Sequence, residues 1–228
     1  MNSAEVAELV SDCPYLYHMA MKGSWPLIQQ IGLVPTGVLL DHFEVPADQR
    51  IDLTTKRRPR TVKISHSVFG SAFIRDQIPL LDDDLAACLT GGLSPSDWHK
   101  KLNERVFFWL TEQRLRRMLC AGAYKGDEHL VLKIPTRGVI DDYWERIELS
   151  PMNSGATRPW RHPRGPETFL PIDHYPYAKW RKARAKGERV VELTVIGGVP
   201  DIAERVEQVR VMSCSGAGPV LYQRAVAA

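Results

Sequence analysis

One carboxylate stands inside a segment that otherwise reads as a core strand. The segment VVELTVIGGVP covers residues 190–200, and its charged residue is Glu192. Neighbouring side chains alternate between the two faces of a strand, so Val191 and Leu193 are expected in a core, with Glu192 on the opposite face. A buried carboxylate without donors is costly and therefore needs hydrogen bonds or a functional site. On an edge strand exposed to solvent, the same residue would not indicate a functional site.

A second ionisable residue, His18, lies in the strand-like segment LYHM, just before a turn and a helix. Taken alone, a histidine in an apolar strand is typical of a hydrogen-bonded core residue. Motifs of other chemistries are missing from the sequence: it has no Walker loop, no GxGxxG, no GxSxG and no HExxH. We therefore predict no metal site, and nothing in the sequence points to a hydrolase triad.

Basic residues gather beside aromatic ones in two segments, RPWRHPR (residues 158–164) and KWRKARAK (residues 179–186). Such clusters can hold a phosphate backbone and stack bases. Solvated helix faces with long basic side chains are the alternative. The candidate nucleic-acid contacts are Arg158, Arg161, Arg164, Lys179 and Arg181.

The composition is that of an ordinary globular protein. The 228 residues carry a formal net charge of +3, and 44% of them are hydrophobic. No apolar run is long enough to span a membrane, and the N-terminus lacks a signal-peptide pattern, so we expect a cytoplasmic protein without membrane contact. The four cysteines are far apart and form no CxxC pair, which predicts four reduced thiols in or near a core.

The elements that must position these residues alternate irregularly. Helices are expected over residues 3–12, 24–33, 36–43, 94–106, 111–124 and 176–187. The expected N-caps are Ser24, Ser94 or Ser96, and Thr111. Strands are expected over residues 15–19, 61–66, 105–110, 129–135, 146–150, 190–197 and 205–213. Residues 47–60 read as a loop or short helix, and residues 67–80 are ambiguous. The absence of regular βα alternation predicts an α+β fold with largely antiparallel sheets. We expect one domain over residues 1–228, with a core over about 15–211 and a C-terminal tail over 212–228.

Four segments resemble the ADP-ribosyltransferase superfamily, in the same order along the chain. The opening LYHMAMKGSWPLIQQIGLVPTG resembles the start of those domains, a strand ending in His or Arg before a helix. RVFFWLTEQRLRRML, RIELSPMNSGAT and VVELTVIGGVPDI resemble segments of the DarT-type DNA ADP-ribosyltransferase toxins. The whole chain also resembles a family of bacterial proteins that share LYHMA…GSWP, RVFFWLTE and NSGAT.

The resemblance implies a split sheet with flanking helices, wrapped around NAD. In that family a glutamate at the position of Glu192 holds the reacting ribose and assists the nucleophile, and a residue at the position of His18 bonds a ribose. An arginine after the first helices binds the phosphates, and the candidates here are Arg57, Arg58, Arg60 and Arg75. We favour Arg58, with Arg75 next. The stretch between TVKIS and RVFFWL is longer than in the toxins, so the alignment does not fix this arginine. The further NAD contacts that we expect are Tyr17, against the nicotinamide, and the polar turn residues Asn153 and Ser154.

The expected function is therefore transfer of ADP-ribose from NAD to a base of DNA or RNA, with release of nicotinamide. By resemblance to the toxins, a cognate antitoxin protein is a possible partner. The alternatives are an NAD-dependent RNA 2′-phosphotransferase, which shares the fold but relies on Arg and His groups, and a non-catalytic nucleotide- or nucleic-acid-binding module. A plain NAD glycohydrolase, with water as acceptor, is a further possibility.

Overall fold

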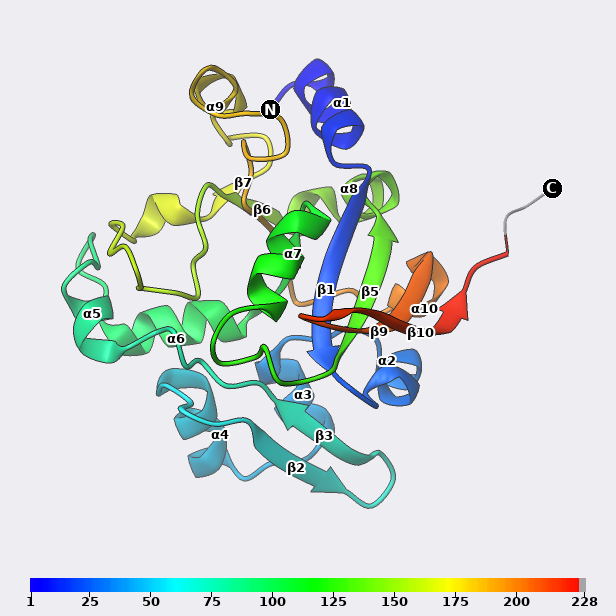
Figure 1. Cartoon of the computed structure of the whole chain (residues 1–228). Coiled ribbons are helices and arrows are strands. Elements are labelled where there is room, and N and C mark those ends of the chain that lie inside the picture. The colour runs from blue at the N-terminus through cyan, green and yellow to red at the C-terminus, as the bar shows by residue number, and fades with distance from the viewer. Residues whose placement is uncertain (226–228) are drawn as a thin grey trace.

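An antiparallel sheet of eight strands runs through the computed structural model, which describes residues 1–225 (Figure 1). The strand order is β10-β9-β5-β1-β4-β8-β6-β7, and a separate hairpin consists of β2 and β3. The strands are β1 (Tyr15–Met21), β2 (Val62–His66), β3 (Gly70–Ile74), β4 (Arg105–Trp109), β5 (His129–Pro135), β6 (Ile147–Ser150), β7 (Leu170–Pro171), β8 (Glu192–Ile196), β9 (Gln208–Ser213) and β10 (Gly216–Gln223). The predicted α+β fold is confirmed.

Short helices surround this sheet. They are α1 (Ser3–Asp12), α2 (Trp25–Ile31), α3 (Thr36–His42), α4 (Ala47–Thr55), α5 (Asp82–Ala86), α6 (Pro95–Asn103), α7 (Glu112–Leu119), α8 (Thr136–Tyr143), α9 (Tyr177–Ala183) and α10 (Ile202–Arg205), with the 3-10 turns η1 (Trp144–Arg146) and η2 (Pro166–Thr168). The expected caps form at two of them: the side chains of Ser94 and Thr111 accept N–H groups in the first turns of α6 and α7. Ser24, expected to cap α2, makes no such bond.

The sheet is weakly joined at its centre. β1 pairs with β5 over seven residues, and β4 pairs with β8 over five. Between β1 and β4, however, only Tyr17 and Trp109 are in register within residues 1–225. The two halves of the sheet therefore diverge from this point, and side chains at the split have room to reach between the strands.

The main core lies on one face of the sheet. Alternate residues of the central strands, such as Leu16, Phe108 and Leu193, are at most 1% exposed there and pack with α1, α2, α8 and α10. The opposite face is covered by α7, whose Leu115 and Leu119 are fully buried against β5 and β9 (Figure 1). Residue parity along each strand thus decides which side chains meet the core and which meet α7.

A close backbone approach ties the end of α2 to the turn after β8. Leu33 and Val199 form an antiparallel bridge with two hydrogen bonds. Gly32 and Gly198 beside it have φ angles of +83° and +84°, and a Cβ at either position would lie 2.5 Å from the facing backbone. Only glycine meets both requirements, so the exit of the Glu192 strand is fixed in place.

The predicted C-terminal tail over residues 212–228 is wrong as an extension of the domain. Residues 216–223 form β10, which pairs with β9 and becomes an edge strand of the main sheet. Gly216, Gly218 and Pro219 made this segment look like a loop, and the register shifts after Ala217 show how the strand accommodates them. The last residues of the predicted tail, 226–228, lie outside the described residues.

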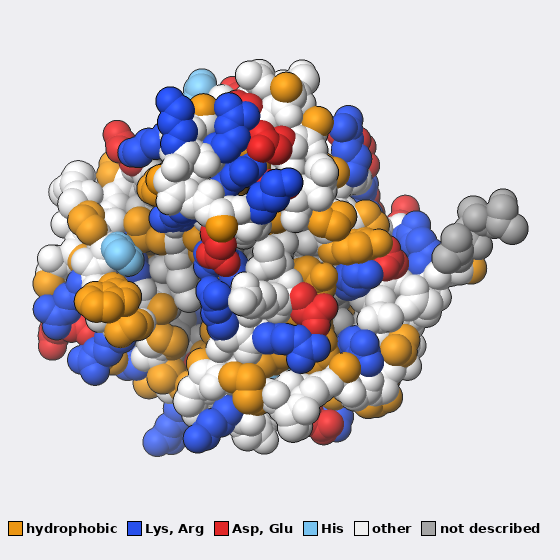
Figure 2. All heavy atoms as spheres, turned by 45° about the horizontal axis from the view of Figure 1, so that its top comes forward, with side chains coloured by type: hydrophobic (Ala, Val, Ile, Leu, Met, Phe, Trp, Pro, Cys, Tyr) orange, Lys and Arg blue, Asp and Glu red, His pale blue; other side chains and the backbone are white. Residues whose placement is uncertain are grey.

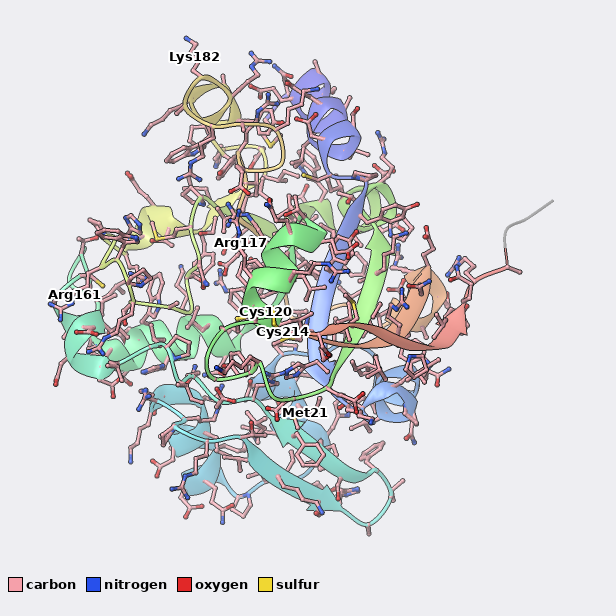
Figure 3. All side chains as sticks on the ribbon, viewed as in Figure 1. Met21, Arg117, Cys120, Arg161, Lys182 and Cys214 are labelled. Carbon is pink, nitrogen blue, oxygen red and sulfur yellow. A yellow bond between two sulfur atoms is a disulfide. The ribbon has the colours of Figure 1, made fainter. Side chains whose placement is uncertain are left out.

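The prediction of four reduced thiols is also wrong. Cys120, at the end of α7, forms a disulfide with Cys214 in the turn between β9 and β10, whereas Cys13 and Cys88 are free and buried (Figure 3). The two bonded cysteines are 94 residues apart, so no local spacing could reveal their contact. Disulfides are typical of oxidising compartments and are rare in the cytoplasm. The cytoplasmic location that we expected from the sequence therefore stays a prediction. Within residues 1–225, no helix combines the length and the apolar character needed to cross a bilayer.

Candidate functional site

A cavity of about 370 Å³ opens where the two halves of the sheet diverge. Its walls come from β1, β3, β4 and β8, from α2 and α3, and from the turn over residues 153–156. Most of the lining side chains are apolar, and a few polar ones converge among them. This size and lining are typical of small-molecule sites. The polar groups that face the cavity are those of His18, Arg58, Arg75, Asp76, Gln77, Asn103, Arg105, Tyr124, Asn153, Ser154 and Glu192.

Glu192 begins β8 and is 4% exposed. Its backbone neighbours are Trp109 on β4 and Ser150 on β6, so it sits inside the sheet and not at an edge. As the alternation predicts, Leu193 packs in the main core and Glu192 lines the cavity. Burial raises the pKa of Glu192 to about 7, against the lowering effect of its hydrogen bonding to Ser154.

The donor to this carboxylate is a backbone amide. The N–H of Ser154 lies 3.2 and 3.3 Å from the two carboxylate oxygens of Glu192. Ser154 is fully buried and lines the cavity, and its hydroxyl oxygen has no hydrogen-bond partner within the described chain. Asn153 is exposed beside it, and its side chain accepts the N–H of Gly155. Both predicted turn residues therefore reach the site.

A buried arginine holds this turn in shape. Arg164 is 1% exposed, and its guanidinium donates to the carbonyls of Asn153, Ser154, Ala156 and His162. The prediction that Arg164 contacts nucleic acid is therefore wrong, because its donors are taken up inside the protein. In its observed position, Arg164 instead holds in place the segment that supplies the Ser154 amide.

His18 lies at the split between the strands. Its Nδ1 is 2.9 Å from the carbonyl oxygen of Phe107 on β4, so Nδ1 carries the proton and donates. Burial lowers the pKa of His18 to about 4, and the ring is neutral at pH 7. Its Nε2 is then a hydrogen-bond acceptor on a residue that lines the cavity. A ligand hydroxyl is a suitable donor to it.

The two candidate phosphate arginines differ in how far their donors are occupied. Arg58 is 7% exposed, and it donates to the carbonyls of Leu53 and Arg75 and to the side chain of Asn103. Burial also lowers its pKa to about 10. Arg75 is half-buried, and its guanidinium rests over the ring of Tyr124. One of its donors, on Nη1, lies 3.3 Å from Nδ1 of His129, and no carboxylate is in ion-pairing distance among the described residues. Arg75 is therefore the better placed cation for a ligand phosphate, which reverses our sequence-based preference.

Tyr17, expected against nicotinamide, does not line the cavity. It packs under α7 with Leu115 and Leu119. Burial raises its pKa to about 12. Trp109, its partner across the split, does line the cavity. The placement of Tyr17 at the ligand is therefore wrong, and the aromatic wall comes from β4.

The exposed basic residues are not brought together. Arg158 and Arg161 pair with Asp84 at the start of α5, whereas Arg181 of α9 pairs with Glu8 of α1. Lys179 lies on α9 near Trp180. Figure 3 shows Arg161 near α5 and Lys182 on α9, in separate parts of the molecule. The four residues Arg158, Arg161, Lys179 and Arg181 thus belong to two surfaces and not one.

Arg105 and Tyr124 are among the polar residues of the cavity that sequence reasoning missed. Arg105, at the start of β4, is buried in an ion pair with Glu148 and stacks 4.3 Å from the ring of Phe169. Tyr124 donates its hydroxyl to Asp76 at 2.7 Å and supports Arg75. Tyr124 follows α7 in a turn without any motif, so no sequence signal pointed to it, whereas the parity of β4 places Arg105 on the same face as Trp109.

Comparison with known protein families gives a match over most of the chain. The model of a family of unknown function, DUF7002, covers residues 14–206. That range contains every strand that lines the cavity, together with His18, Arg75, Ser154 and Glu192. A search of the curated proteins finds no match.

Proposed function

Since the chain belongs to DUF7002, a family whose description names no activity, its function must be inferred from the site, and we propose that it transfers ADP-ribose from NAD to a nucleic acid. The observation that carries this proposal is Glu192. It is a buried carboxylate that lines a ligand-sized cavity and receives one backbone N–H, without an ion-pair partner among the described residues. Such a costly arrangement is typical of a functional group.

The chemistry suits a fixed carboxylate. Cleavage of the bond between ribose and nicotinamide develops positive charge on the sugar, as in glycoside hydrolysis. Ionised Glu192 would stabilise that charge in a site sheltered from water, and it can accept the proton of the attacking group. The bond to nicotinamide breaks with its electron pair, the acceptor nucleophile bonds to the ribose carbon, and the acceptor's proton leaves through Glu192.

Other cavity residues match the remaining parts of NAD. The free guanidinium donors of Arg75 suit the pyrophosphate, because a planar guanidinium binds phosphate oxygens in a bidentate manner. Neutral His18 can accept a ribose hydroxyl through Nε2. The unpartnered hydroxyl of Ser154 offers a further contact beside Glu192, and the ring of Trp109 offers an apolar wall for nicotinamide.

Support for a nucleic acid acceptor comes from the segment that follows the Ser154 turn. Trp160 is 71% exposed and stands between Arg158 and Arg161, whose side chains are also exposed. An exposed indole flanked by cations can stack an unpaired base and hold the adjoining phosphates. A base must be splayed out of its strand to reach an enclosed reacting centre, so we propose a single-stranded acceptor.

A second candidate is an NAD-dependent RNA 2′-phosphotransferase. It is favoured by the density of basic groups in the cavity, where His18, Arg58, Arg75 and Arg105 all contribute to the lining. In that reaction the phosphate would be the group removed from the RNA, and Glu192 would be dispensable. An RNA that carries a 2′-phosphate and loses it in the presence of NAD would establish this function in place of the first.

The direct experiment uses NAD labelled in its adenylate part. The protein is incubated with this NAD and with separate pools of single-stranded DNA, single-stranded RNA and protein, and each pool is examined for label. We expect label in one of the nucleic acid pools together with released nicotinamide. Label in the protein pool alone would refute the nucleic acid acceptor, and no release of nicotinamide in any pool would refute the transferase.

A further inference from the structure

Three guanidinium groups converge on one residue beside the cavity. Arg114 of α7 forms an ion pair with the carboxylate of Glu188, and Nη1 of Arg117 lies 3.9 Å from the same carboxylate. Nη1 of Arg184, directly after α9, donates to the backbone carbonyl of Glu188 at 3.3 Å. Two guanidinium groups thus share the carboxylate of Glu188, and a third contacts its backbone.

Nearby acids do not balance this excess. Glu8 and Asp12 are engaged by Arg189, and Glu112 pairs with Arg116 on another side of α7. Within residues 1–225, Glu188 is the only carboxylate in ion-pairing distance of Arg114 and Arg117, and Arg184 has no carboxylate in that distance. Figure 2 shows Lys and Arg side chains gathered over the upper part of the face that it presents.

The cluster is also open to a ligand. The side chain of Arg117 is 60% exposed, so its guanidinium is free to meet solvent anions. Nε of Arg114 has no hydrogen-bond partner within residues 1–225, but it is buried, so the donors open to a solvent ligand are those of Arg117. The guanidinium of Arg184 lies 4.1 Å from the ring centre of Trp180, which holds it flat at the edge of the cluster. Unused donors on preoriented arginines favour binding of an oxyanion.

This cluster adjoins the reacting centre. Met118, which follows Arg117 on α7, lines the cavity. Nη1 of Arg184 donates to the carbonyl of Pro151 at 2.6 Å, at the start of the segment that carries Ser154. The charge of Arg114 also favours the ionised form of Glu192. Figure 3 shows Arg117 on α7, apart from both Arg161 and Lys182.

We propose that Arg114, Arg117 and Arg184 form a subsite for the phosphodiester groups of the acceptor strand, which holds that strand next to Glu192. The inference rests on the proposed function for its biological meaning, but the binding event needs no NAD. Glu188 acts as the internal counter-ion that a phosphate displaces from Arg117. Because the contact is with the backbone, it would position the strand without selecting its sequence.

Binding of a fluorescein-labelled single-stranded DNA, and of an RNA of the same sequence, tests this subsite in the absence of NAD. Each phosphate contact on a single strand contributes about 0.7 to the slope of log affinity against log salt. Arg117→Ala should weaken binding and lower that slope by about 0.7, and R117A/R184A should lower it by about 1.4. Thermal unfolding establishes that each variant is folded.

Two further variants separate a phosphate contact from general effects. Arg116→Ala removes an equal charge from the same helix but on the side paired with Glu112, and its slope should equal that of the wild type. Glu188→Gln removes the internal counter-ion and should tighten binding, whereas a merely structural Glu188 would not.

The proposal is overturned if R117A/R184A keeps the slope of R116A, or if neither oligonucleotide binds the wild type. Neither result depends on NAD turnover, so failure of the subsite is distinguishable from failure of the proposed transferase, which only the release of nicotinamide reports. The DNA and RNA arms show which strand the subsite accepts.

Discussion

The amide of Ser154 donates to both carboxylate oxygens of Glu192, at 3.2 and 3.3 Å, in the interior of the protein. The two residues are 38 positions apart, and the segment between β6 and β8 brings them together. One amide offsets only part of the cost of burying a charge. Glu192 is consequently poised between its protonated and ionised forms near neutral pH.

The pKa of about 7 for Glu192 predicts a rising pH profile. The ionised form is the one that stabilises the developing positive charge, so the rate of nicotinamide release should rise through about pH 7. His18 stays neutral throughout this range, since its pKa is about 4. A rate measured between pH 5 and pH 9 checks this, and a profile that is flat there would contradict the assignment.

The same group predicts how stability depends on pH. Folding raises the pKa of the Glu192 carboxyl from 4.5 to about 7. Between these pH values the native state therefore binds more protons than the unfolded state. Its contribution is present below pH 4.5 and is lost as the pH rises to about 7, by up to roughly 3 kcal/mol. Glu192→Gln should therefore be more stable than the wild type at pH 8, as measured by denaturant unfolding. Its free energy of unfolding should not show the fall that the wild type shows as the pH rises to about 7. An equal pH dependence in both proteins would refute the raised pKa.

Arg164 is predicted to position the site without touching the ligand. Arg164→Lys cannot reach the four carbonyls that the guanidinium now serves, so the free energy of unfolding should fall by roughly 3 kcal/mol. The looser turn should also weaken the bond from Ser154 to Glu192, and this loss moves the midpoint of the pH profile upward. Arg161→Lys, on the exposed pair with Asp84, should change neither quantity. An unshifted midpoint in folded R164K would leave Arg164 a purely structural role.

The disulfide between Cys120 and Cys214 is predicted to stabilise the fold. It joins residues 94 positions apart, and closing a loop of that length contributes up to about 4 kcal/mol in the chain-entropy model. Reduction by a dithiol should therefore lower the melting temperature of the wild type. The variant C120S/C214S should melt at the lower temperature with or without the dithiol, because Cys13 and Cys88 are free in both proteins. If the dithiol left the melting temperature of the wild type unchanged, this result would contradict the disulfide.

The sequence predicted the elements near Glu192 well, because their patterns are local. Alternation around Glu192 and His18 identified β8 and β1, and the caps Ser94 and Thr111 located the starts of α6 and α7. Alternation did not decide whether Tyr17 or His18 reaches the cavity, because His18, Met19 and Ala20 line it in succession. Sequence reasoning thus recovered the strands and helix starts that depend on neighbouring residues.

Long-range contacts were beyond that reasoning. The burial of Arg164 depends on carbonyls that point inward only once the turn is folded. The occupied donors of Arg58 and the free ones of Arg75 depend on β3, which the sequence left ambiguous. The convergence of Arg114, Arg117 and Arg184 joins segments about 70 residues apart, as the contact between Arg114 and Glu188 shows. Composition and periodicity do not reveal such contacts between distant residues.

The most direct test of the account compares nicotinamide release by the wild type and by Glu192→Gln, with NAD and single-stranded nucleic acid present. A matched control is Glu207→Gln, which removes a carboxylate paired with Lys133 outside the cavity. We predict that E192Q releases nicotinamide about two to three orders of magnitude more slowly, while E207Q and the wild type act alike. Release by folded E192Q at the rate of the wild type would contradict the central role of Glu192.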